Sequence, residues 1–188
     1  EKFYPYQAPL SSDATTLSVD LSEATQAVKE NRFEEALMLF EIILKDHPNH
    51  IDSLYLACVS SRYLKKFDDA KKYIKRLLLI APDMGRAYQE LGHINRDMGN
   101  EEKAAINYRQ ACELNPALLA SWNFLHQYFV KSKNKPAADH AYSQIKKRQS
   151  LPPALLYIDQ ILNEGRLGLA ETKIRAFLKK NPTHTYAM

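Results

Sequence analysis

Prolines recur at a fixed interval through the chain, and this interval constrains the fold more than any other feature of the sequence. Pro48, Pro82 and Pro116 lie 34 residues apart, and Pro182 follows 66 residues later, which fits two slightly shorter intervals. Each proline follows a helical pattern that it cannot continue, and we expect it to open the next helix. A period of this length is typical of a repeat protein, so we expect an elongated core shared between repeats.

Alanines recur in register with the prolines, at intervals of 34, 34, 34 and 32 residues: Ala36, Ala70, Ala104, Ala138 and Ala170. A larger residue follows each alanine by four positions, on the same helical face: Phe40, Ile74, Tyr108, Tyr142 and Ile174. Alanine lets two helices approach closely, and the larger residue fills the groove between neighbouring repeats. We therefore expect Tyr108 and Tyr142 to be core side chains.

Hydrophobic periodicity predicts two helices in each interval. The expected pairs are 20–30 with 34–46, 51–64 with 67–80, 84–98 with 101–114, 118–131 with 135–149, and 153–164 with 167–180. Pro136 is expected to begin a helix, and Pro152-Pro153 to mark a shortened junction. With only five glycines and little two-residue alternation, the sequence predicts an all-α protein.

First-helix residues complete a known signature. In the third interval Tyr88, Leu91 and Gly92 precede the tight-turn sequence Met98-Gly99-Asn100. Trp122, Leu125 and Phe129 take the matching places in the fourth interval, where His126 replaces the usual glycine. The chain resembles the tetratricopeptide-repeat family from about Leu17 to His184. The resemblance implies a right-handed superhelical solenoid of about five helix-turn-helix repeats, at about 17–50, 51–84, 85–118, 119–150 and 151–184.

Both ends of the chain depart from the repeat. Residues 1–16 contain two prolines and several aromatic residues, so we expect an extended segment. Its aromatic strip either lies in a groove of its own or a neighbouring solenoid, or belongs to a linker tail. Residues 185–188 are interpreted as the start of a truncated further repeat, which predicts a fragment of a longer protein. An uncapped C-terminal edge of this kind favours self-association.

Motifs for catalysis, cofactors or metals are not evident. The glycines form no phosphate-binding loop, and His47 and His50 lack a carboxylate or cysteine at ligand spacing. Cys58 and Cys112 are predicted to be buried thiols, which favours a cytoplasmic setting. No apolar run is long enough to cross a membrane. The net charge is only +4, and acidic residues are interspersed with the basic clusters, so no nucleic-acid partner is predicted.

In tetratricopeptide folds the first helices line an inner groove. The same geometry predicts a concave peptide-binding face here, made of Asp52, Tyr55, Arg62, Tyr63, Arg86, Gln89, His93, Arg96, Asn123, Gln127 and Lys131. The basic members favour a protein or peptide segment with acidic or carboxyl groups. The alternative is an ordinary hydrated groove. Some relatives bind a chaperone's C-terminal carboxylate through a clamp of lysine, asparagine and arginine; those residues are absent at the matching positions, so no co-chaperone of that type is predicted.

A narrower resemblance begins near Arg86. The stretch RAYQELGHINRDMGNEEKAAINYRQACELNPALLASWNFL and the later EGRLGLAETKIRAFLKKNPTH are similar to the N-terminal arm of bacterial tetratricopeptide-repeat sulfotransferases. The resemblance implies an arm for substrate recognition or dimerisation, with the catalytic domain C-terminal to this chain. Two hypotheses follow: a protein-binding scaffold without catalytic activity, or the arm of a sulfotransferase.

Overall fold

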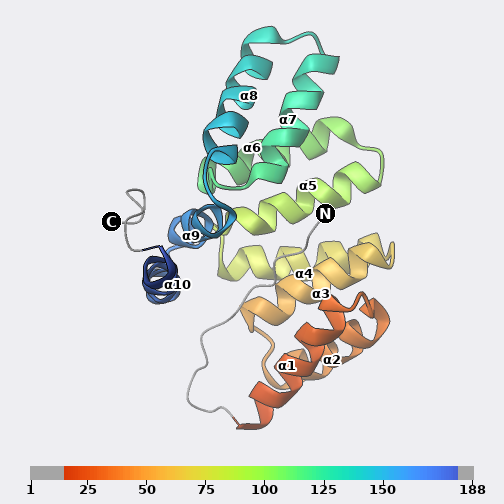
Figure 1. Cartoon of the computed structure of the whole chain (residues 1–188). Helices are drawn as coiled ribbons and strands as arrows, with labels where there is room; N and C mark the ends of the chain where they lie inside the picture. Colours follow the sequence, from red (N-terminus) through yellow and green to blue (C-terminus); the bar gives the residue numbers. More distant parts are fainter. Residues whose placement is uncertain (1–14, 182–188) are drawn as a thin grey trace. The chain divides into compact units, whose positions relative to one another are not determined.

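The computed structural model describes residues 15–181, with side chains from Leu21 onward, and that range contains ten α-helices and no strand (Figure 1). The helices are α1 (Thr15–Lys29), α2 (Phe33–Asp46), α3 (Ile51–Tyr63), α4 (Phe67–Ile80), α5 (Gly85–Asp97), α6 (Glu101–Leu114), α7 (Leu119–Lys131), α8 (Lys135–Gln149), α9 (Pro153–Asn163) and α10 (Leu167–Lys180). The all-α prediction is confirmed. Most of the predicted segments 1–16 and 185–188 lies outside the described residues.

The predicted helix pairs are all present, and their bounds agree with the prediction to within about two residues, except at the start of α1. That helix begins at Thr15, five residues before the predicted start. The chain divides into two compact units, an N-terminal unit that ends at Asp83 and a C-terminal unit that begins at Met84. The first unit contains α1 to α4 and the second contains α5 to α10.

The turn inside each helix pair uses one residue in the left-handed region. These residues recur at the repeat interval: Asn31, Lys65, Gly99, Lys133 and Gly165, with φ between 56° and 80°. Glycine adopts this conformation without steric cost, whereas a lysine there is strained by the proximity of its Cβ to the backbone. The turn geometry is therefore set by the repeat, whichever residue occupies the position.

The sequence analysis predicted that the prolines between repeats open the following helices, and this prediction is wrong. Pro48, Pro82 and Pro116 each lie three residues before the next helix begins, in the turn that separates two helix pairs. In two of these turns a backbone hydrogen bond closes four residues, from His50 N to His47 O and from Leu118 N to Asn115 O. Proline's fixed φ suits the second position of such a turn. Pro136 and Pro153 do stand in the first turn of a helix.

The alanine positions form the centre of the packing, since all five alanines are at most 5% exposed. Three of the larger residues that follow them, Phe40, Ile74 and Tyr108, are also buried. Tyr142 is not, and the prediction that it belongs to the core is wrong: it is 47% exposed, beside the ring of His126. Both cysteines are buried free thiols, and burial raises the pKa of Cys112 to about 12.

The fifth helix pair departs from the stack formed by the preceding pairs of the C-terminal unit. Instead of continuing the stack from α8, α9 lies near the start of α5 (Figure 1). Asn115 Nδ2, in the turn after α6, donates a hydrogen bond to Gln160 O of α9 at 3.1 Å. Arg86 of α5 lies 3.8 Å from Glu164, which follows α9. The fifth pair is therefore held against repeat three.

The described residues contain neither a membrane-spanning helix nor a metal-binding cluster. Each helix there is too short or too polar to cross a lipid bilayer. The same residues contain no group of three or more histidine, cysteine or acidic side chains that could hold a metal ion.

Candidate interaction surfaces

The predicted face of the N-terminal unit lies on α3. Asp52, Tyr55 and Arg62 are all buried, with at most 9% of their surface exposed. Tyr63 is 44% exposed; its ring stacks on Phe33 with the centroids 4.3 Å apart, and the guanidinium of Arg62 lies 4.4 Å from its centroid. Of these four predicted residues, Tyr63 offers the most surface to solvent.

The predicted face of the C-terminal unit combines α5 and α7. Gln89 Nε2 of α5 donates a hydrogen bond of 2.9 Å to Ser121 Oγ of α7, which joins the first helices of two successive repeats. His93 Nδ1 shares a hydrogen bond of 2.7 Å with the hydroxyl of Tyr108, and the two rings meet edge to face. The structure thus joins α5 to α7 at Gln89 and fixes the orientation of His93.

The predicted basic residues of this unit already have acidic neighbours. The nitrogen–oxygen separations are 3.8 Å for Arg86 with Glu164, 2.9 Å for Arg96 with Asp97, and 2.6 Å for Lys131 with Glu101. Arg86 is buried beside a carboxyl whose pKa is raised by its own burial, although Arg86 and Arg166 act in the opposite direction. An acidic ligand would have to compete with these internal carboxyl groups.

Asn123 and Gln127 of α7 are both exposed to solvent, as is Lys131. Asn123 and Gln127 are four positions apart, so their amide groups lie on the same side of the helix. A side-chain amide carries both a donor and an acceptor, which matches the N–H and C=O groups of a peptide backbone. This side of α7 is suited to hydrogen bonding with an extended chain.

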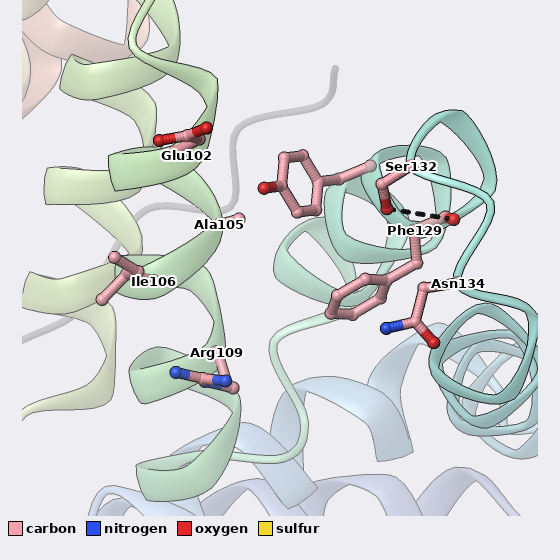
Figure 2. A pocket seen from close by; sticks show the side chains of 8 residues that line it. Glu102, Ala105, Ile106, Arg109, Phe129, Ser132 and Asn134 are labelled. Atoms are coloured by element: carbon pink, nitrogen blue, oxygen red, sulfur yellow. Dashed lines mark hydrogen bonds between the residues drawn. The ribbon is translucent and has the colours of Figure 1, made fainter.

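A hollow of about 410 Å³ opens between α6 and the end of α7 (Figure 2). Its lining combines aromatic, aliphatic and charged side chains: Glu102, Ala105, Ile106, Arg109, Tyr128, Phe129, Ser132 and Asn134. Tyr128 and Phe129 follow directly after Gln127 in the helix, so they point to the side roughly opposite Asn123 and Gln127. The hollow and the predicted face are therefore separate surfaces of α7.

A series of ring contacts connects the hollow to the core. Tyr108 packs against Phe124 with centroids 4.5 Å apart, Phe124 stacks on Tyr128 at 6.3 Å, and Tyr128 meets Phe129 edge to face at 5.6 Å. Tyr108 is fully buried and belongs to the same cluster as Ala105. Because each ring is held by the next, the aromatic wall of the hollow is fixed before any partner arrives.

Sequence reasoning missed the hollow, since Phe129 had been interpreted only as a repeat-core residue. The sequence signal that could have indicated the hollow was the aromatic pair Tyr128-Phe129 of α7. The second part of that signal was Ile106 of α6, a non-core position that is 57% exposed. Periodicity identifies which positions face the core of a helix pair, but not where two packed helices leave a gap. The cluster of Arg86, Glu164 and Arg166 was also missed, because it forms between repeats that are far apart in the sequence.

Comparison with known families agrees with the geometry. The tetratricopeptide-repeat family model matches residues 85–118, which are α5, α6 and the turn after them. Residues 85–118 are a tetratricopeptide repeat. The other helix pairs share the positions of its buried alanine and its left-handed turn residue. The fold of the chain is that of the tetratricopeptide-repeat proteins.

Two characterised proteins are similar in sequence to parts of the chain. Over 135 residues the chain is 25% identical to the anaphase-promoting complex subunit 8 of Arabidopsis thaliana, covering 71% of this chain and 23% of that protein. Over 100 residues it is 33% identical to the heat shock protein STI1 of Saccharomyces cerevisiae, covering 50% of this chain and 16% of that protein. The chain thus spans less than a quarter of the length of these relatives.

A crystal structure of the MamA protein shows the same fold. It superimposes with a TM-score of 0.59 at 19% sequence identity, and the match covers 89% of this chain and 92% of that one. At this identity the likeness concerns the fold alone. Stacked helix pairs of this kind form a scaffold suited to protein–protein interaction.

Proposed function

We propose that this chain is a protein-interaction scaffold that captures a polypeptide segment on the face of α5 and α7 that bears Gln89, Asn123 and Gln127. The observation that carries the proposal is the exposure of two amide side chains on α7, a helix that a hydrogen bond joins to α5. Amide groups recognise the backbone of an extended peptide without requiring a charged partner. The proposal is also supported by the similarity to a subunit of the anaphase-promoting complex.

The preference of this face for acidic segments is a weaker part of the proposal. Arg96 and Lys131 each contact a carboxylate of the chain itself, so a ligand carboxylate gains only the difference between two ion pairs. Exposed ion pairs contribute little, about 1 kcal/mol or less. We therefore propose that hydrogen bonding by Asn123 and Gln127 contributes more to affinity than the basic residues do. For the N-terminal unit, a binding role of the predicted residues of α3 stays a prediction.

Selection from a random peptide library displayed on phage tests the proposal with the full chain as bait. The dissociation constant of each selected peptide is then measured for the parent protein and for the double variant Asn123→Ala/Gln127→Ala. We expect at least a tenfold loss, because two or more hydrogen bonds to the peptide are removed. Lys103→Ala, an exposed position of α6, is the control. Equal affinity in the double variant would exclude this face as the binding site.

The alternative is an arm that recognises the substrate of a sulfotransferase or mediates its dimerisation, and it depends on the sequence resemblance from Arg86 onward. Sequencing the parent gene beyond the codon for Met188 distinguishes the two. A phosphate-binding loop followed by an α/β pattern would support the sulfotransferase arm, whereas further repeats would support the scaffold alone. Sedimentation of the chain over a range of concentrations tests the proposed self-association.

A further inference from the structure

The hollow between α6 and α7 has an apolar centre that is open to solvent. Ala105 and Ile106 of α6 both line it, and they are 8% and 57% exposed. Figure 2 shows Phe129 across the gap from α6. Apolar side chains arranged around a concave surface lose their contact with water only when another apolar group enters. The centre of the hollow is therefore shaped for one large apolar side chain.

The two ends of the hollow differ in charge. Glu102 and Arg109 lie on α6 at opposite ends of the hollow in Figure 2. They are seven residues apart, which is about 10 Å along a helix. Both side chains are exposed, and Ile106 lies between them. The wall formed by α6 thus presents an acidic group, an apolar group and a basic group in line.

Asn134 adds a hydrogen-bond donor at the basic end. Its Oδ1 accepts a hydrogen bond from the backbone N–H of Ala137 at 3.3 Å, as the N-cap of α8. This contact fixes the orientation of the amide, so that Nδ2 points toward the hollow (Figure 2). Arg109 and Asn134 therefore present N–H groups at the same end, which suits a carboxylate.

We infer that this hollow is a second binding site, distinct from the face of Asn123 and Gln127, for an extended protein segment with the order acidic, large apolar, basic. The acidic side chain would contact Arg109 and Asn134, the apolar side chain would fill the space between Ile106 and Phe129, and the basic side chain would contact Glu102. Alternate residues of an extended chain point to the same side and are about 7 Å apart, so the three side chains come from positions i, i+2 and i+4.

Peptide titration of the ¹⁵N-labelled full chain tests the inference. The probe is the acetylated and amidated peptide Glu-Ser-Phe-Ser-Lys. We expect its amide chemical-shift changes to cluster at residues 102–109 and 128–134. Replacing phenylalanine by serine in the peptide should weaken binding at least tenfold, because the apolar centre then remains hydrated. Equal binding by that peptide, or shifts concentrated at Asn123 and Gln127, would overturn the inference.

Reversing the charge at Arg109 tests the order of charges in the hollow directly. Arg109→Glu should weaken binding of Glu-Ser-Phe-Ser-Lys at least fivefold and strengthen binding of Lys-Ser-Phe-Ser-Lys, since both ends of the hollow are then acidic. Lys147→Glu, an exposed position on α8, makes the same change in net charge outside the hollow and should affect neither peptide. Identical behaviour of the two variants would attribute the effect to overall charge and contradict the site.

The oligomeric state tests whether a second copy of the chain, rather than a peptide, occupies the hollow. If the hollow holds a second copy of the chain, Ile106→Ser should shift the sedimentation of the protein toward the monomer in the absence of peptide. That result would overturn the assignment to a partner peptide. With the peptide as occupant, we expect Ile106→Ser to leave sedimentation unchanged and to weaken peptide binding.

Discussion

Repeat three and the fifth helix pair share a pattern in sequence and differ in how they pack. Both have a glycine in the left-handed turn position, Gly99 and Gly165, and both bury the repeat alanine completely. In repeat three the residue four positions after that alanine is Tyr108, which is fully buried. The corresponding Ile174 of α10 is only half-buried, and Ala170 is the one described residue of α10 classed as buried.

The difference comes from one close approach between helices. Gly92 of α5 faces the ring of Tyr108, and a Cβ at that position would lie 2.7 Å from two ring carbons. In the fifth pair the matching residue is Ile158, which is itself buried. A glycine opposite a ring lets two helices close around a large side chain, whereas two aliphatic residues keep them apart. The repeat pattern therefore determines helices and turns, and in repeat three the glycine–ring contact contributes to the close packing of α5 on α6.

The largest effect is expected from Tyr108→Ala. Removing a fully buried ring leaves a cavity and should lower the free energy of unfolding by about 4 kcal/mol. Urea unfolding followed by the fluorescence of Trp122, the single tryptophan of the chain, measures this in the C-terminal unit. Ile174→Ala is the matched variant at the same repeat position and should lower the free energy by about 1 kcal/mol. Equal losses would show that the two pairs are packed alike.

Asn115→Ala tests the link between the two pairs. Asn115 is 1% exposed; its Oδ1 accepts from Ala117 N and its Nδ2 donates to Gln160 O. Losing both hydrogen bonds and leaving the buried N–H of Ala117 unsatisfied should lower the free energy of unfolding by about 2 kcal/mol. Hydrogen exchange should accelerate more in α9 than in α6. Unchanged exchange in α9 would mean that this contact does not hold the fifth pair in place.

Gly92→Ala should lower the free energy of unfolding by about 1 to 2 kcal/mol. The new methyl group collides with the Tyr108 ring, and the better helix propensity of alanine offsets only part of that strain. Gly168→Ala is the control in α10, where no atom lies within 4 Å of the added Cβ. It should raise the stability by up to about 1 kcal/mol. A loss of stability in both variants would remove the contrast between the pairs.

The smallest expected effect is a dependence of stability on pH at the contact between Glu164 and Arg86. Burial raises the pKa of Glu164 above its ordinary value, and Arg86 and Arg166 reduce that rise. The folded state then holds the proton more tightly than the unfolded chain. This contribution to stability is full below the ordinary carboxyl pKa and is lost as pH rises through the raised value.

Unfolding of the parent protein and of Glu164→Gln across that pH range measures the contribution. The parent should lose stability more steeply than the variant as pH increases above the ordinary carboxyl range. A parallel pair of curves would show that Glu164 has the same proton affinity in the folded and unfolded states.

Much of the fold followed from the sequence because it depends on local rules. Alanine spacing and hydrophobic periodicity placed the described helices, and Met98-Gly99-Asn100 marked the turn between α5 and α6. The surfaces were harder to foresee. The positions of Arg96 and Lys131 in the repeat were readable, but their pairing with Asp97 and Glu101 depends on side-chain geometry in the folded chain.

The sequence by itself determined that the chain is a series of helix pairs with a buried alanine at each crossing, since period and residue size are properties of short segments. Only the tertiary structure decided that α9 lies near the start of α5, that Tyr142 is exposed, and that a hollow remains between α6 and α7. These features arise from contacts between residues far apart in the chain, where packing of whole surfaces outweighs local preference.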